Sequence, residues 1–218
     1  MKSYDQLCED MQQMVSWHVP EFEIKDKESS FLMKLIDKSV MWIFNKEFMT
    51  RYTTTVGYSI YVPKGKSNQS LWRTIAHEWW HMHSMKKLGA FLHGFLYLFP
   101  QTLSPLALLA ILGFWFPWAV WFLTALVFLL PLPAYFRYRE ELDAYTVSMA
   151  AYLWRYKSIP DDYIDHVAKN FYKSNYYFMW PFKDSVINKL KERRSLLIGG
   201  AFDAQPIFGD VKSVIKEG

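Results

Sequence analysis

The feature that most constrains this chain is a long run without formal charge. From residue 88 to residue 136 there is no Asp, Glu, Lys or Arg. A membrane-spanning helix needs about 20 apolar residues, so the run is long enough to cross a bilayer twice. Residues 113–117 are the predicted turn between two helices, and further kinks or breaks are expected at Pro100, Pro105, Pro131 and Pro133. The alternative is a buried hairpin inside a soluble core, which would be unusually long and unusually free of charge.

Positive charges flank this run on both sides. Lys86 and Lys87 precede it, and Arg137 and Arg139 follow it. Because cytoplasmic loops carry the excess of Lys and Arg, both ends of the hairpin are predicted to lie in the cytoplasm. The N-terminal residues are polar and lack the apolar core of a signal peptide. We therefore expect a multi-pass membrane protein in contact with the lipid bilayer, with its soluble parts and both termini in the cytoplasm.

Composition narrows the classes of function. The formal net charge is +4 and no block of Lys and Arg resembles a nucleic-acid-binding tail, so no nucleic-acid partner is expected. Cys8 is the only cysteine, which excludes an internal disulfide and a cysteine-based zinc knuckle. Hydrophobic residues make up 51% of the chain and aromatic residues 19%, which indicates contact with lipid. Nothing in the sequence indicates the oligomeric state.

The predicted fold class is α+β, mainly helical, with a small antiparallel sheet. Residues 1–87 and 137–218 form the two halves of one core, and residues 88–136 form the inserted two-helix transmembrane hairpin. Apolar and polar residues alternate from Thr54 to Val62, which is the period of a half-buried strand. A helix is predicted to begin near Ser67 or Ser70 and to end at about Lys87.

An earlier segment, residues 29–46, has the spacing of an amphipathic helix. Ser29 or Ser30 is its predicted cap. Its predicted apolar face consists of Leu32, Leu35, Ile36, Val40, Ile43 and Phe44.

The helix that precedes the charge-free run contains RTIAHEWWHMHS, residues 73–84. His77 and His81 are four residues apart, so they lie on one face of a helix and can bind one metal ion. Glu78 stands beside them and can take the proton of an attacking water molecule. Imidazole is a good zinc ligand, and a catalytic zinc keeps one position open. The pattern therefore predicts a Zn²⁺ site with Glu78 as general base.

A third ligand is expected on the helix that follows the hairpin, in RYREELDAYTVSMAAY. If the hairpin leaves and re-enters the same side of the membrane, Glu140 or Glu141 can return to the motif helix, and Glu141 is favoured. The alternative is that both are solvated charges at a helix start, where the helix dipole favours them. The predicted membrane topology and the predicted metal site thus agree with each other. The first is inferred from the Lys and Arg residues that flank the hairpin, and the second from the His and Glu residues.

Together, AHEWWHM and EELDAY resemble the gluzincin zinc peptidases, especially their minimal minigluzincin core. In that family an edge strand precedes the His-Glu-x-x-His helix, and a Glu from a later helix completes the metal site. The resemblance covers roughly residues 50–87 and 137–152. It implies His77, His81 and Glu141 as zinc ligands, and Glu78 as the general base.

One position departs from the family pattern. The family has an Asp that supports a ligand histidine, and Tyr145 stands there in this chain. A tyrosine hydroxyl can also orient an imidazole, but as a weaker partner. The inserted hairpin resembles membrane-bound gluzincins that process proteins at the cytoplasmic face, and also hairpin-bearing peptidases encoded by tailed bacteriophages.

The predicted function is a membrane-anchored zinc metalloendopeptidase that cuts an extended segment of a peptide or protein substrate held along residues 54–62. A second hypothesis is a non-catalytic, zinc-stabilised membrane protein, such as an accessory of phage infection or lysis, and Tyr145 favours it. A third is an intramembrane protease. It is disfavoured because Arg73, Lys86 and Lys87 bracket the motif. The sequence does not indicate which substrate is cut.

The remaining candidates for a role in the site are three histidines and two tyrosines. His83 is predicted to point away from His81 on the helix. His93 is interpreted as a hydrogen-bonded interior histidine. His166, Tyr176 and Tyr177 are candidates for the donor that stabilises an oxyanion, and the sequence does not choose among them.

Overall fold

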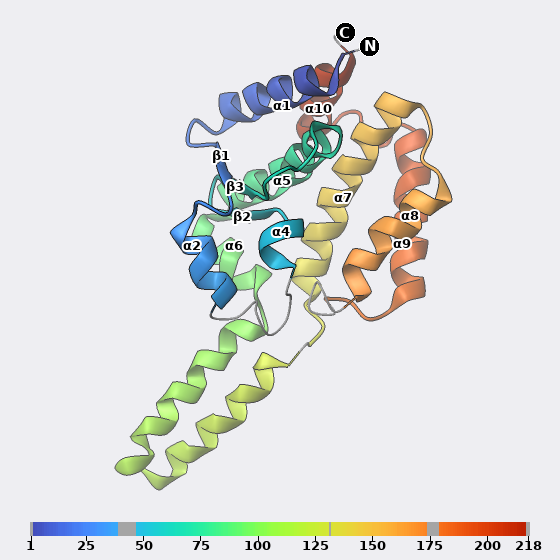
Figure 1. Ribbon diagram of the computed structural model, residues 1–218. Helices are drawn as coiled ribbons and strands as arrows, with labels where there is room; N and C mark the ends of the chain where they lie inside the picture. The colour runs from blue at the N-terminus through green and yellow to red at the C-terminus, as the bar shows by residue number, and fades with distance from the viewer. Residues whose placement is uncertain (1, 39–46, 131, 174–178, 217–218) are drawn as a thin grey trace.

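The computed structural model describes residues 2–38, 47–130, 132–173 and 179–216. Helices dominate, and a small three-stranded sheet accompanies them (Figure 1), which confirms the α+β class. In chain order the elements are α1 (Tyr4–His18), β1 (Glu23–Asp26), α2 (Phe31–Ile36), α4 (Phe48–Arg51), β2 (Thr54–Val56), β3 (Ser59–Val62), α5 (Asn68–Leu88), α6 (Ala90–Tyr97), η2 (Gln101–Phe114), η3 (Pro117–Leu129), α7 (Tyr135–Tyr156), α8 (Asp161–Tyr172), α9 (Lys183–Ile198) and α10 (Pro206–Lys216).

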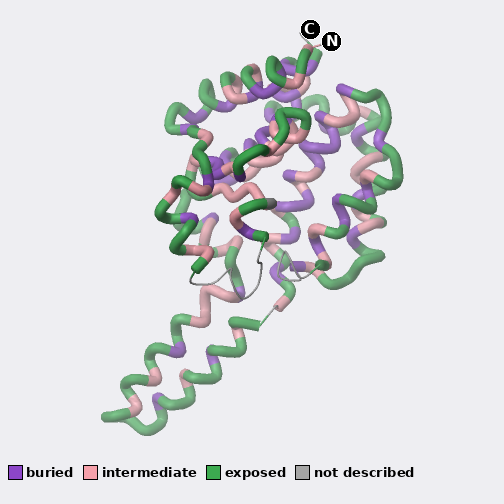
Figure 2. The backbone as a smooth tube through the Cα atoms, in the orientation of Figure 1, coloured by how far each residue is buried: buried purple, intermediate pink, exposed green. Residues whose placement is uncertain are grey.

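Helices α5 and α7 pack against each other at the centre of the core. Helix α1 contacts α5, α10 contacts α7, and α8 and α9 form a pair next to α7 (Figure 1). Small side chains allow the central helices to approach closely, because Ala76 on α5 and Ala144 on α7 are both fully buried. Figure 2 shows buried residues along α7 and on the inner sides of the surrounding helices. The central pair therefore forms the rigid frame on which side chains from both helices meet.

Helix α5 has clear start and stop signals. The hydroxyl of Ser67 accepts a hydrogen bond from the backbone N–H of Gln69, which caps the first turn. Lys86 and Lys87 lie in the last turn, where the helix dipole favours positive charge. The predicted helix from Ser67 to about Lys87 is confirmed.

The sheet differs from the prediction in two ways. The predicted single strand Thr54–Val62 is a hairpin, in which β2 and β3 are antiparallel and joined by a two-residue turn. Gly57 has a φ of +59°, the left-handed conformation that such turns need and that glycine adopts without strain. Strand β1 pairs in parallel with β3, so the sheet is mixed rather than antiparallel, in the order β1-β3-β2. Strand β2 thus remains an edge strand.

The helix predicted for residues 29–46 is shorter in its described part. Ser30 caps α2 by accepting a hydrogen bond from the N–H of Met33, as predicted. However, Met33 is the buried residue, whereas Leu32 and Leu35 are exposed, so the predicted apolar face was wrong there. The remaining positions of that face, Val40, Ile43 and Phe44, lie outside the described residues.

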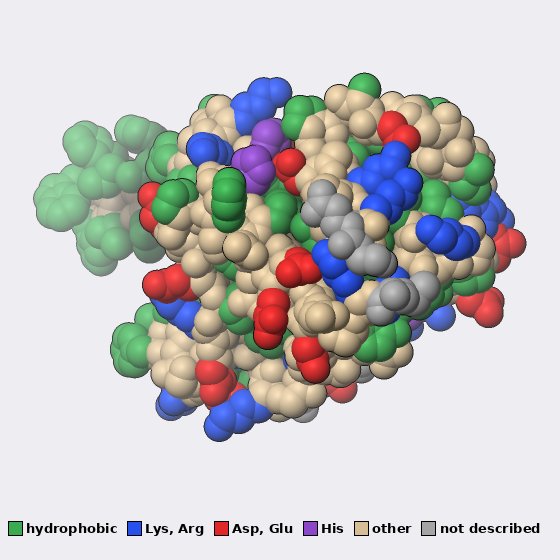
Figure 3. Space-filling view, turned by 90° about the horizontal axis from the view of Figure 1, so that it is seen from above, with side chains coloured by type: hydrophobic (Ala, Val, Ile, Leu, Met, Phe, Trp, Pro, Cys, Tyr) green, Lys and Arg blue, Asp and Glu red, His purple; other side chains and the backbone are tan. Residues whose placement is uncertain are grey.

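The charge-free run forms α6 and then a two-helix hairpin that projects from the core (Figure 1). Both arms, η2 and η3, are 3₁₀-helices that pack along each other. The turn between them falls within residues 113–117, as predicted. At Gly113 a Cβ atom would lie 2.9 Å from Val120 Cγ2, so glycine allows the arms to meet. The surface of the hairpin is hydrophobic (Figure 3).

The helices of this region are short or bent. Within the described parts of the chain, no single helix is both long enough and apolar enough to cross a membrane. Helices α6 and η2 meet both criteria only as a pair, which is bent by 89°.

Candidate metal centre

Helix α5 places the two motif histidines on one face. His77 and His81 are one turn apart, and their Nε2 atoms lie 3.3 Å from each other. Their side chains are 12% and 11% exposed, so both rings are largely shielded from solvent. The helix therefore presents two imidazole nitrogens to one point in space, as the four-residue spacing predicts.

Helix α7 brings Glu141 to the same point. Its Oε2 atom lies 3.3 Å from Nε2 of His77, and its Oε1 atom lies 3.6 Å from Nε2 of His81. Zinc ligands bind at about 2.0–2.2 Å, so neighbouring ligand atoms of a tetrahedral site are separated by about 3.3 Å. The three side chains form a group that could hold a metal ion. Their atom types and spacing fit Zn²⁺, and the prediction that brought Glu141 to the motif helix agrees with this geometry.

The charges of this cluster compensate one another. Burial by itself lowers the pKa of His81, but the carboxylates of Glu141 and Glu140 outweigh burial and raise that pKa to about 9. Burial raises the pKa of Glu141, whereas His81, His77 and a hydrogen bond from Tyr97 hold it well below its usual range. Glu141 is therefore ionised. Because a metal ligand must be deprotonated, a bound cation would take the place of the proton on His81.

Glu140 lies behind the ligands. Its Oε2 atom is 3.9 Å from Nδ1 of His81 and 3.5 Å from Nε2 of His93, and its Oε1 atom accepts a hydrogen bond from the hydroxyl of Ser84 at 3.0 Å. Burial raises the pKa of Glu140, but His81, His93 and Ser84 lower it to about 2. The 3.9 Å contact with His81 is too long for a hydrogen bond, and among the described residues neither Nδ1 of His81 nor Oε2 of Glu140 has a hydrogen-bond partner, so the interaction is electrostatic. Glu140 and Glu141 thus have different places in the site, one on each side of His81.

The position that departs from the gluzincin pattern touches the other ligand. The rings of Tyr145 and His77 are 4.5 Å apart and meet edge to face, and the hydroxyl of Tyr145 accepts a hydrogen bond from Asn170 at 2.7 Å. The carboxylate nearest to the other nitrogen of a motif histidine belongs to Glu140, which faces His81 at 3.9 Å. Sequence reasoning missed this because it searched the family position and not the residue before the ligand.

Helix α6 supplies two further neighbours from the charge-free run. The hydroxyl of Tyr97 donates a hydrogen bond to Glu141, and the Tyr97 ring lies 5.8 Å from that of His81. His93 is buried, as interpreted from the sequence, but its Nε2 atom lies 3.5 Å from Glu140 and has no hydrogen-bond partner among the described residues. His81, His93 and Glu140 form a second group that could hold a metal ion. His83 packs 5.9 Å from the ring of Trp79 and belongs to neither of the two groups found among the described residues. Tyr97 had no signal in the sequence, because an isolated tyrosine in an apolar run is most simply explained by packing.

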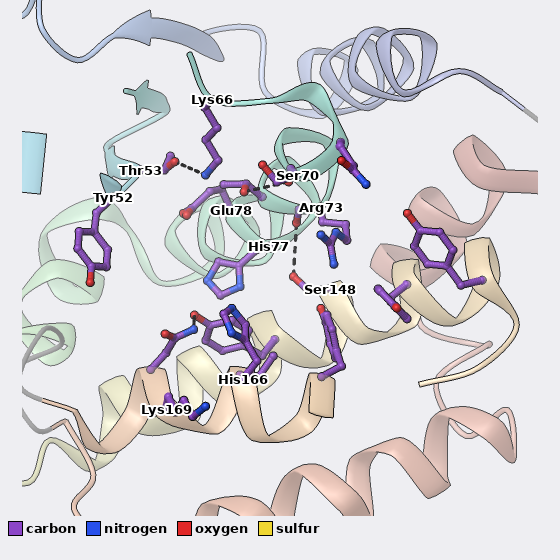
Figure 4. Close-up of a pocket in the computed structure, with 18 of the residues that line it drawn as sticks. Tyr52, Thr53, Lys66, Ser70, Arg73, His77, Glu78, Ser148, His166 and Lys169 are labelled. Carbon is purple, nitrogen blue, oxygen red and sulfur yellow. Dashed lines mark hydrogen bonds between the residues drawn. The ribbon is translucent and has the colours of Figure 1, made fainter. Parts of the chain in front are cut away.

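A cleft of about 940 Å³ opens at the metal centre, between α5 on one side and α7 and α8 on the other. His77 and Glu78 lie on its α5 wall (Figure 4), so the predicted general base faces the space that a substrate would fill. His166 of α8 lies on the opposite wall. The two other candidates for the oxyanion donor, Tyr176 and Tyr177, lie outside the described residues. Tyr52 and Thr53, which precede the edge strand β2, also line the cleft.

Comparisons of the chain with family models, with curated proteins and with solved structures give no match. The site is therefore interpreted from its own geometry.

Proposed function

We propose that this protein is a zinc-dependent peptidase of the gluzincin type. The observation that carries the proposal is the triangle of His77, His81 and Glu141 donor atoms at 3.3–3.6 Å, with Glu78 on the wall of the adjoining cleft. Two imidazoles and one carboxylate leave a position open on a tetrahedral zinc ion, which distinguishes a catalytic from a structural site. When bound, zinc would supply Lewis acidity to polarise a carbonyl group and to acidify water.

The protein side chains would divide the remaining work. Glu78 takes a proton from the attacking water and passes it to the leaving nitrogen. His166, across the cleft, donates a hydrogen bond to the oxygen on which negative charge develops. An extended substrate can pair with the edge strand β2, because the residues just before β2 lead into the cleft.

We further propose that the hairpin inserts into the lipid bilayer and holds the core at the cytoplasmic surface. Large apolar side chains cover its outside: Phe114 is 89% exposed, Trp121 76% and Trp115 70%. An apolar surface of this kind marks a contact with a partner, and the absence of charge favours lipid over protein. Arg137 and Arg139 follow the hairpin in the first turns of α7, and Lys86 and Lys87 precede α6 in the sequence, as expected if both ends of the charge-free run are cytoplasmic. Lys86 donates a hydrogen bond to the carbonyl of His18 at the end of α1.

The position of α6 supports a link between the membrane and the metal centre. This short helix leads from α5 to the hairpin and gives Tyr97 and His93 to the surroundings of the ligands. The site is thus next to the proposed membrane surface, and its substrate is a peptide segment presented there.

The alternative of a zinc site with only a structural role has Tyr145 in its favour. Against it stand the carboxylate of Glu140 behind His81 and the access from the cleft to Glu78. The substitution Glu78→Gln separates the two functions. The peptidase proposal predicts that the variant binds zinc as the native protein does but loses cleavage of a random peptide pool, measured by mass spectrometry of the products.

The matched control is Glu192→Gln, an exposed carboxylate on α9 that pairs with Lys189. It should leave zinc content and cleavage unchanged. Full cleavage by the Glu78→Gln protein would contradict the proposed mechanism, and zinc binding without any cleavage by the native protein would favour the structural alternative.

A further inference from the structure

The wall of the cleft carries an excess of positive charge. Among the described residues that line it, four are Lys or Arg and one, Glu78, carries a carboxylate. Six more are tyrosines, whose hydroxyl groups can donate hydrogen bonds. A cleft lined by charges of one sign concentrates ligands of the opposite sign. Hydrolysis of a peptide bond does not require an excess of positive charge in the cleft. The excess is therefore relevant to which ligands the cleft binds.

Of these four cations, Arg73 is the one best placed to bind a ligand that lies next to His77 and Glu78. It precedes His77 by one helical turn on the same face of α5, and it lies with Glu78 on one side of the cleft (Figure 4). Its guanidinium carbon lies 5.4 Å from the ring of Tyr152 and 5.8 Å from the ring of Tyr163. Aromatic faces stabilise a guanidinium group without neutralising its charge. The two rings, from α7 and α8, therefore fix the position of the cation across the cleft.

The charge of Arg73 is not balanced by a protein carboxylate. Among the described residues no ion pair involves Arg73, and its buried Nε atom has no hydrogen-bond partner there. By contrast, Arg193 pairs with Asp143 and Arg194 with Asp161, each at 2.7 Å. The planar fork of a guanidinium group matches a carboxylate with two parallel hydrogen bonds. Arg73 thus lacks the partner that its chemistry favours.

We propose that Arg73 binds a carboxylate of the substrate and makes the protein selective for anionic peptides. This inference rests on the proposed peptidase function. Residues four apart on a helix are separated by about 6 Å along its axis. An extended peptide advances about 3.4 Å per residue. A carboxylate on Arg73 therefore belongs to a residue one or two positions from the bond that is cut, and it is either an acidic side chain or the C-terminal carboxylate.

The test is a binding experiment that does not depend on cleavage. Zinc-loaded Glu78→Gln protein in detergent is mixed with matched pools of short random peptides, which contain either Glu or Gln and have either a free or an amidated C-terminus. The bound fraction is quantified by mass spectrometry. Hydrogen bonds to charged groups are about twice as strong as neutral ones, so peptides with a carboxylate should bind about 10- to 100-fold more tightly than their neutral counterparts.

Three variants in the same background assign the effect. Arg73→Met should abolish the preference, and Arg73→Lys should retain a part of it, because lysine keeps the charge but loses the fork. Arg139→Met, an exposed arginine on α7 outside the cleft, should leave the preference unchanged. The zinc content and the circular dichroism spectrum of each variant show whether it is folded.

The experiment also distinguishes whether the bound carboxylate belongs to an acidic side chain or to the C-terminus of the peptide. A preference for Glu-containing peptides assigns the subsite to an acidic side chain, and a preference for a free C-terminus assigns it to the terminal carboxylate. Equal binding of charged and neutral pools overturns the proposal, as does a preference that survives in folded Arg73→Met protein. If the preference depends on Arg73 while the protein with native Glu78 cuts none of the peptides, the subsite stands and the peptidase function fails.

Discussion

Glu140 faces Nδ1 of His81 at 3.9 Å, on the side of the ring opposite its metal-facing nitrogen. The two atoms, Oε2 of Glu140 and Nδ1 of His81, have no hydrogen-bond partner among the described residues, so Glu140 acts on the ring through its charge. The adjacent Glu141 faces the Nε2 atoms of His77 and His81. In the proposed metal centre, Glu141 is a ligand and Glu140 supports His81.

The substitution Glu140→Gln tests this supporting role. Loss of such a carboxylate typically reduces metal affinity about 10- to 100-fold, because the histidine is less basic and less firmly oriented. We expect this loss in competition titrations with a zinc chelator. Glu23→Gln, an exposed glutamate paired with Lys25, is the control and should bind zinc normally. Unchanged affinity in folded Glu140→Gln protein would remove Glu140 from the site.

The hydrogen bond from Tyr97 to Glu141 predicts an effect of similar size for Tyr97→Phe. The variant keeps the ring next to His81 and loses only the hydroxyl group that orients the carboxylate. A hydrogen bond to a charged group contributes about 1.5–3 kcal/mol, so zinc affinity should fall by about tenfold or more. The same chelator competition measures it, with Tyr135→Phe at an exposed position as the control. Equal affinities of the two variants would show that Tyr97 only packs.

The exposed face of the hairpin predicts how the protein partitions onto lipid. An arginine at the centre of a bilayer helix costs about 2.5–3.5 kcal/mol, so Trp121→Arg should reduce partitioning onto phospholipid vesicles by about 100-fold. Trp17 on α1 is 81% exposed and lies outside the hairpin, so Trp17→Arg is a matched control. Vesicle flotation measures both. If both variants float like the native protein, the hairpin does not insert at Trp121.

The buried amine of Lys27 predicts a dependence of stability on pH. Its Nζ atom donates hydrogen bonds to the carbonyl groups of Phe48 and Tyr52 and to the hydroxyl of Thr54, each at 2.7 Å. Burial lowers its pKa from 10.5 to about 8. Between these values the unfolded chain binds more protons than the folded one, so the free energy of unfolding should increase as pH rises through this range.

The increase is at most about 3 kcal/mol, because each pKa unit corresponds to about 1.4 kcal/mol. Urea titrations of the native protein and of Lys27→Met measure it as a difference, since the native protein should gain stability relative to Lys27→Met as the pH rises from 8 to 10.5. Two parallel pH profiles would show that Lys27 has an ordinary pKa in the folded protein.

The parts of the site that were predictable depend on spacing within one helix. His77 and His81 could be paired because four residues make about one turn, and Glu141 because the chain was expected to return to the motif helix after the charge-free run. The course of the chain around Gly57 was not predictable from alternation, since the pattern of apolar residues continues across the turn. The parallel pairing of β1 with β3 joins segments that are distant in the sequence, and no local pattern reports it.

The surroundings of the ligands were the least predictable part. Tyr97 and Glu141 meet only because α6 folds back against α7, which no local pattern reports. The same is true of Arg73, whose place among aromatic rings depends on the packing of α7 and α8 against α5. The sequence thus predicted one meeting of side chains across helices, that of Glu141 with His77 and His81, whereas the surroundings of Tyr97 and Arg73 depend on packing that only the structure reports.

The most direct test of this account is the zinc content of detergent-purified protein prepared without chelators. Elemental analysis of the native protein should give about one zinc per chain, and His81→Ala and Glu141→Ala should each lose it, because two remaining ligands do not hold the ion firmly. Absence of zinc from the native protein, or zinc retained in both variants, would contradict a metal centre formed by His77, His81 and Glu141.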